Sequence, residues 1–71
     1  MIVLEDTPID RDSLRLRNEF LEMPGLAVNV SQTARLFGIR LDRAADMLER
    51  LEREGFLMRD VNGAFRRRPR A

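Results

Sequence analysis

The stretch from Ser31 to Arg68 constrains the fold more than any other part of this chain, because it contains several local signals in a defined order. A short helical pattern ends at Gly38, a longer amphipathic pattern follows, and two strand-like runs flank the dipeptide Asn62-Gly63. Both residues of that dipeptide tolerate positive φ, so it predicts a two-residue type I′ turn between antiparallel strands. The order of the signals therefore predicts helix, turn, helix and β-hairpin.

Length and composition predict one small domain. With 71 residues and 44% hydrophobic content, the chain can fold around a single core. A domain of this size buries only about 60% of its unfolded surface. We assign residues 1–71 to one domain, with an N-terminal segment at 1–7 and a basic tail at 69–71. The absence of cysteine excludes disulfides and thiolate metal sites, so packing must stabilise the fold.

The first third of the chain predicts a helix and then a short strand. Thr7 is a suitable N-cap, Pro8 a suitable first helical residue, and Pro24-Gly25 ends the helix. The stripe expected to face the core contains Ile9, Leu14, Leu16, Phe20, Leu21 and Met23. A period-two alternation predicts the strand, with apolar residues at Leu26, Val28 and Val30.

Two further helices follow in the sequence. Ser31 is a suitable N-cap for a helix over Gln32 to Phe37, which Gly38 can close in the left-handed conformation. The next helix is expected to start at or just after Asp42 and is called helix 3 in this subsection. Its buried stripe is predicted to contain Ala44, Met47, Leu48 and Leu51.

The predicted two-residue turn also sets the register of the hairpin. It pairs Val61 with Ala64, Asp60 with Phe65, and Arg59 with Arg66. Phe65 is expected to be a core or cross-strand residue rather than a platform for stacked bases.

The segment from Gly38-Ile39 through Leu48, Leu51 and Gly55-Phe56-Leu57 resembles the turn, recognition helix and following strand of the winged helix-turn-helix superfamily. Residues 19–26 also resemble a segment of short bacterial winged-helix proteins. The resemblance implies an α+β fold, a winged helix-turn-helix of three helices with a short strand and a C-terminal β-hairpin wing. In that superfamily the second helix of the pair enters the DNA major groove, and the wing contacts the backbone or the minor groove.

The resemblance implies that this chain is a small DNA-binding protein, a transcriptional regulator that contacts double-stranded DNA with helix 3 and the wing. The residues expected to contact DNA are all arginines: Arg40, Arg43 and Arg50 of helix 3, and Arg59, Arg66, Arg67 and Arg68 of the wing. Residues 58–71 carry five arginines against one aspartate, a net charge of +4. Three carboxylates of helix 3 oppose this interpretation because they would repel phosphate: Asp42, Asp46 and Glu49.

Other interpretations of the same residues remain open. The charges of helix 3 can form ordinary surface pairs, namely Asp46–Arg50, Glu49–Arg53 and Arg43–Asp46, and the basic C-terminus can simply be solvated. Alternatively, the fold is a protein–protein interaction or dimerisation module without DNA binding, with a protein partner on the acidic face of helix 3. A homodimer could form through helix 1 and Met1–Leu4.

The composition leaves catalysis little support. The chain contains no histidine, cysteine, tyrosine or lysine, so its serines and threonines lack the usual base, and we expect no enzyme activity. No phosphate-binding glycine loop or metal-ligand spacing occurs, so neither a cofactor nor a metal is expected. The sequence contains no signal-peptide pattern and no apolar run of membrane-spanning length, so we expect a cytoplasmic protein without membrane contact.

Overall fold

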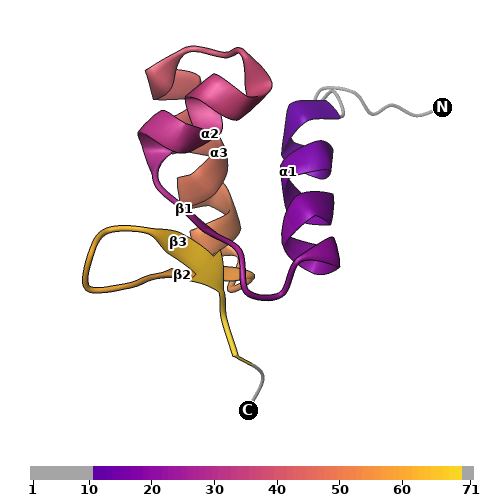
Figure 1. Cartoon of the computed structure of the whole chain (residues 1–71), viewed down its shortest axis with the longest axis vertical. Helices are drawn as coiled ribbons and strands as arrows, with labels where there is room; N and C mark the ends of the chain where they lie inside the picture. The colour runs from indigo at the N-terminus through magenta and orange to yellow at the C-terminus, as the bar shows by residue number, and fades with distance from the viewer. Residues whose placement is uncertain (1–10, 70–71) are drawn as a thin grey trace, which may run out of the picture.

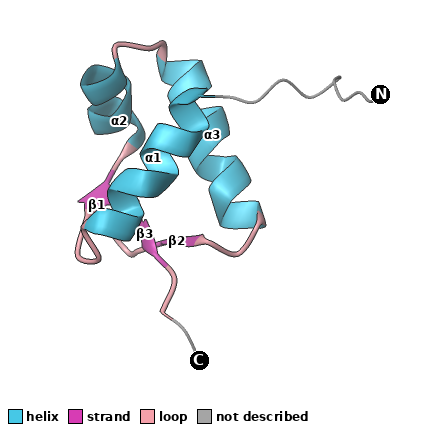
Figure 2. Cartoon of the chain, turned by 90° about the vertical axis from the view of Figure 1, so that its right-hand side faces the viewer, coloured by secondary structure: helices cyan, strands magenta, loops and turns pink. Residues whose placement is uncertain are grey.

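The computed structural model describes residues 11–69, which form three helices and one three-stranded antiparallel sheet. The elements follow the order α1 (Arg11–Glu22), β1 (Ala27–Val28), α2 (Val30–Phe37), α3 (Leu41–Arg53), β2 (Leu57–Arg59) and β3 (Phe65–Arg67). The described chain is therefore α+β, with the sheet at one end of the three helices (Figures 1 and 2). The expected helix start at Thr7-Pro8, the stripe position Ile9 and the segment Met1–Leu4 lie outside the described residues.

Helix α1 ends at Glu22, just before Pro24-Gly25, as the sequence predicts. Its buried face is narrower than predicted. Leu16 and Phe20 are buried, whereas the other described members of the predicted stripe are about half exposed, at 50% for Leu14, 46% for Leu21 and 45% for Met23. The prediction of a wide apolar stripe was wrong. Only Leu16 and Phe20, which are four residues apart and therefore lie on the same side of the helix, pack into the small core.

The start of α2 differs from the prediction. Asn29, not Ser31, is the N-cap: its side chain accepts a 2.7 Å hydrogen bond from the backbone N–H of Gln32, whose side chain accepts from the N–H of Asn29 at 2.9 Å. This reciprocal capping box starts the helix at Val30, so Val30 cannot extend the strand. The strand is consequently reduced to Ala27–Val28.

Helices α2 and α3 form a tight pair. Gly38 closes α2 at φ 64°, a left-handed conformation that costs glycine nothing and L-residues about 1–2 kcal/mol. Thr33 is fully buried, and its hydroxyl donates to the backbone carbonyl of Asn29 at 3.0 Å.

The predicted stripe of α3 is confirmed, because Ala44, Met47, Leu48 and Leu51 are all buried. The helix begins one residue earlier than predicted, at Leu41.

The hairpin turn also differs from the prediction. Asp60 and Ala64 close the hairpin, with the Asp60 N–H donating to the Ala64 carbonyl at 2.8 Å, so the loop has three residues instead of two. The Gly63 N–H donates to the Asp60 carbonyl at 3.0 Å, and φ is positive at Gly63 (82°) but not at Asn62. This combination is a type I turn followed by a left-handed glycine. A type I′ turn, which needs two positive φ values, is excluded.

The Asp60 side chain organises this turn. Its Oδ1 accepts hydrogen bonds from the backbone N–H groups of Asn62 at 2.9 Å and Ala64 at 3.0 Å. Aspartate favours the first position of a type I turn, and glycine the fourth. The four residues that begin at Asp60 follow this preference.

The sheet has the strand order β1-β3-β2, so β3 is central. The core lies between the helices and one face of this sheet, and its buried apolar residues are Leu16, Phe20, Val28, Met47, Leu48, Leu51, Leu57 and Phe65. Phe56 packs edge-on against Phe20, with ring centroids 6.4 Å apart, and so connects α1 to the start of β2. Within residues 11–69, no helix combines the length and apolar character needed to cross a membrane.

Candidate nucleic-acid interface

The observed register distributes the hairpin arginines over both faces of the sheet. Arg59 pairs with Phe65, and Leu57 pairs with Arg67. Cross-strand partners share a face, as do residues two apart on one strand, so Arg59 and Arg67 lie on the core-facing side with Phe65. Arg66 lies on the opposite, outer face. The prediction that Arg59 pairs with Arg66 was wrong, because the longer turn shifts the register by one residue and reverses the face.

Arg59 is bound within the protein. Its Nη2 is 2.9 Å from Glu52 Oε1 of α3, and its guanidinium carbon lies 4.6 Å from the centroid of the Phe65 ring. An exposed ion pair of this kind is worth about 0.2–1 kcal/mol, and a cation–π contact at an exposed site about 0.5–1 kcal/mol. Arg59 therefore connects the hairpin to α3, and the Glu52 carboxylate compensates its charge.

Arg67 is also held on the core-facing side. Its guanidinium carbon lies 5.0 Å from the centroid of the Phe56 ring, and its Nε is buried without a hydrogen-bond partner. Arg17 of α1 contacts the same ring at 4.7 Å. Two arginines from different elements thus share one aromatic ring. The sequence prediction did not assign a role to Arg17, and only its position next to the buried Leu16 hinted that it could reach the core edge.

Arg66 and Arg68 form the exposed cationic part of the sheet's outer face. Both side chains are exposed, and the N–H of Arg68 donates to the Phe56 carbonyl at 3.0 Å, which extends the β3–β2 pairing beyond the strand. An open groove of about 540 Å³ runs along this face, and it is lined by Pro24, Met58, Arg66, Arg67, Arg68 and Pro69. No acidic residue is among these lining residues. We refer to this face, with Arg66 and Arg68 at its centre, as the outer sheet face.

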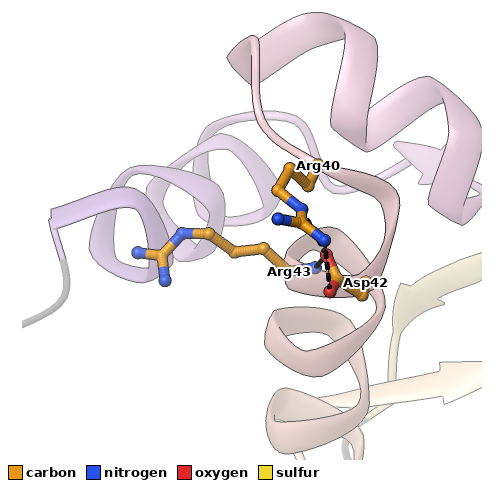
Figure 3. Close-up of polar contacts among 3 residues, drawn as sticks. All are labelled: Arg40, Asp42 and Arg43. Carbon is orange, nitrogen blue, oxygen red and sulfur yellow. Dashed lines mark hydrogen bonds and ion pairs between the residues drawn. The ribbon is translucent and has the colours of Figure 1, made fainter.

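At the start of α3, two of the predicted DNA-contacting arginines are in ion pairs. Arg40 Nε lies 3.3 Å from Asp42 Oδ1, and both side chains are largely exposed (Figure 3). The Arg43 side chain extends away from this pair toward α1 (Figure 3). Its Nη2 lies 3.6 Å from Oδ2 of Asp12 in that helix. Asp42 is not an N-cap, since Arg40 holds that position without a side-chain cap.

A polar cleft of about 320 Å³ lies between α1 and the start of α3. It is lined by Ser13, Arg40, Asp42, Arg43, Asp46, Met47 and Arg50. The three predicted arginines of α3 are thus brought together, but two aspartates lie among them. Within residues 11–69, no ion pair shorter than 4.0 Å joins Asp46 to Arg50 or Glu49 to Arg53, so those two predicted surface pairs are absent.

The described residues offer no candidate metal centre. No group of three or more acidic side chains in residues 11–69 is arranged so that it could hold a metal ion. The carboxylates of α3 instead take part in arginine contacts or lie on the surface, as Asp42 and Asp46 do respectively.

Comparisons of the chain with known proteins found no matching protein family, no similar curated protein and no similar solved structure.

Proposed function

We propose that the chain is a winged helix-turn-helix protein that binds double-stranded DNA and acts as a small transcriptional regulator. The order helix, strand, helix, helix, strand, strand supports this fold, and so does the glycine turn between α2 and α3. In this proposal α3 is the recognition helix and the β2–β3 hairpin is the wing.

The observation that carries the proposal is the outer sheet face. Arg66 and Arg68 are exposed there, and no carboxylate lines the groove that contains them. Guanidinium groups in such a position can pair with phosphate oxygens, and each neutralised phosphate contributes about 0.9 to the logarithmic salt dependence of binding. The outer sheet face is therefore the principal DNA contact in this proposal.

Helix α3 contributes less to affinity than the hairpin does. Arg40 and Arg43 are paired with Asp42 and Asp12, and the acidic Asp46 lies beside them in the same cleft. A guanidinium that already has a carboxylate partner must exchange it for a phosphate or a guanine edge. Binding is therefore dominated by phosphate contacts and shows weak sequence preference.

The test is a titration of the full chain with random-sequence duplex DNA at low and moderate salt. Arg66→Ala with Arg68→Ala should weaken binding and flatten the salt slope by about 2 if each arginine contacts one phosphate. The matched control is Arg59→Ala with Arg17→Ala, which removes the same charge from two exposed arginines that do not line the groove of the outer sheet face. Equal losses of DNA affinity in the two double variants would mean that binding depends only on the net charge of the protein. A wild-type protein that does not bind duplex DNA at low salt would refute the proposal.

A second candidate is a protein-interaction module that uses α3. The ion pairs of Arg40 and Arg43 support it, because they leave Asp46 and Glu49 as acidic groups on a helix surface of almost balanced charge. Such a surface fits a partner with basic side chains. This candidate gains support if the DNA titration is negative and Asp46→Arg with Glu49→Arg abolishes capture of that partner.

A further inference from the structure

The ring of Phe56 carries two guanidinium groups that have no carboxylate partner. The guanidinium carbons of Arg17 and Arg67 lie over this ring, at 4.7 and 5.0 Å from its centroid. The two carbons are therefore at most 9.7 Å apart, which is the sum of these distances. Within residues 11–69, neither guanidinium forms an ion pair or donates a hydrogen bond to another group of the protein. Two like charges thus share one ring without compensation.

The core fixes the position of this ring. Phe56 meets the fully buried Phe20 of α1 edge-on, at an interplanar angle of 88°. Its backbone carbonyl accepts a hydrogen bond from the N–H of Arg68, the residue after Arg67. These contacts bring the middle of α1 and the end of β3 to the same ring. Folding therefore places Arg17 and Arg67 together, although they are distant in the sequence.

This pair differs from the arginines whose charge the protein itself compensates. Arg40, Arg43 and Arg59 each lie within 4.0 Å of a carboxylate oxygen. A cation–π contact attracts a guanidinium but supplies no negative charge, and two like charges at this separation repel each other.

Arg67 has a second unsatisfied feature. Its Nε is buried without a hydrogen-bond partner, and a buried donor of this kind raises the free energy of the folded state. An oxyanion held by Arg17 and Arg67 would compensate both charges and would offer acceptor oxygens to their N–H groups. The pair therefore has the charge and the hydrogen-bond donors of an anion site.

We propose that Arg17 and Arg67 bind one phosphate-type oxyanion at the junction of α1 and β3. A phosphate dianion balances two guanidinium charges, and charge-assisted hydrogen bonds of about 2.8 Å from both sides allow its tetrahedral oxygens to bridge groups at this separation. Free phosphate and a phosphate monoester share this chemistry. The bound anion joins α1 to the sheet and so stabilises the fold. This inference does not depend on DNA binding.

Thermal unfolding of the full chain, monitored by circular dichroism, tests the site. Inorganic phosphate replaces chloride at constant ionic strength, so that general screening is unchanged. The midpoint temperature should rise and then saturate. With a dissociation constant of about 5 mM, the rise at about 20 mM phosphate should be roughly 4–8 °C.

Two other anions define the ligand. Adenosine monophosphate distinguishes the two sources of phosphate, since a tighter response than that to inorganic phosphate identifies a monoester, and an equal or weaker response identifies free phosphate. Acetate carries one charge on a planar group and should produce no saturable rise. An equal response to acetate would overturn the assignment to phosphate.

Substitutions of the two arginines test their role. Arg17→Gln and Arg67→Gln should each raise the apparent dissociation constant for phosphate by roughly fivefold or more. The matched control is Arg53→Gln, which removes one charge from an exposed arginine of α3 without a ring or carboxylate partner in the described part of the chain. Because the readout is the difference between phosphate and chloride, a lower midpoint of a variant in chloride does not affect it. The general stabilisation that phosphate gives by exclusion from protein surfaces acts on all variants alike.

Three further results would overturn the proposed site. They are a rise that does not saturate, a rise that is equal in the wild type and in both glutamine variants of the site, and a rise that is lost in Arg66→Ala with Arg68→Ala but kept in the glutamine variants. The last result would place the phosphate on the outer sheet face. A negative DNA titration together with the expected phosphate response would refute the proposed function and leave this site in place.

Discussion

Arg59 lies directly opposite Phe65 in the β2–β3 pair, with its guanidinium carbon 4.6 Å from the centroid of the ring. This contact turns Arg59 toward the core-facing side of the sheet, where Glu52 compensates its charge at 2.9 Å. Arg66, one position further along β3, faces outward. The register of a single hairpin therefore determines which guanidinium groups remain available to a partner.

Gly63→Ala should destabilise the protein by about 1–2 kcal/mol, because an L-residue at φ 82° is strained. Urea denaturation gives the free energy of unfolding. The control is Gly25→Ala, a position without positive φ and without any atom near the added methyl group, which should change stability by less than about 0.5 kcal/mol. Equal effects at both positions would mean that the hairpin turn lacks the left-handed glycine.

Asn29→Ala should cost about 0.5–2 kcal/mol, since it removes the N-cap of α2 and half of its capping box. Ser31→Ala should be close to neutral, because the Ser31 hydroxyl only accepts a long 3.4 Å contact from Arg35. Thermal unfolding monitored by circular dichroism compares the two. A larger loss of stability from the Ser31 change would show that Ser31 is the N-cap.

Leu51→Ala should cost about 2–5 kcal/mol, because this leucine is 4% exposed within the core formed by α3, α1 and the sheet. Leu36→Ala removes the same atoms from a side chain that is 68% exposed, so its cost should be small. The comparison uses the denaturant concentrations at the midpoint of unfolding, provided that the slope of the unfolding free energy against denaturant is the same for both variants. Near-wild-type stability of the Leu51 variant would show that α3 is rotated relative to the core.

Asp46→Arg should raise the affinity for random duplex DNA roughly tenfold at low salt if α3 lies at the groove, because it replaces repulsion of phosphate with attraction. Glu49→Arg should act in the same direction. Glu54→Arg, at the C-cap of the same helix, makes an equal change of charge away from the groove-facing positions. Fluorescence anisotropy measures all three, and equal gains for Asp46 and Glu54 would argue that α3 does not face DNA.

Several elements could be predicted because their signals are local. The stripe of Ala44, Met47, Leu48 and Leu51 follows from helical periodicity, and all four residues are buried. Gly38 closes α2 in the left-handed conformation that its position indicated. Each of these features depends on residues within one or two turns of one another.

For other features, the sequence contains more than one residue suited to the same structural role. Asn29 and Ser31 are both good caps, and the choice of Asn29 depends on Gln32, three residues later, completing a capping box. Asn62-Gly63 indicated a type I′ turn. Asp60 instead accepts three hydrogen bonds that stabilise a type I turn, two with its side chain and one with its backbone carbonyl. In both cases a side chain outside the obvious motif decided the outcome.

The amino-acid order alone established the succession of helices and strands and the buried stripe of α3, since periodicity and turn residues act over short distances. Packing between distant segments decided the rest. It matched Arg43 with Asp12, placed Arg17 and Arg67 on the same Phe56 ring, and left Arg66 and Arg68 on the outer sheet face. A charge acts on a partner only when its side chain is exposed and uncompensated, and these two conditions depend on strand register and on contacts between elements.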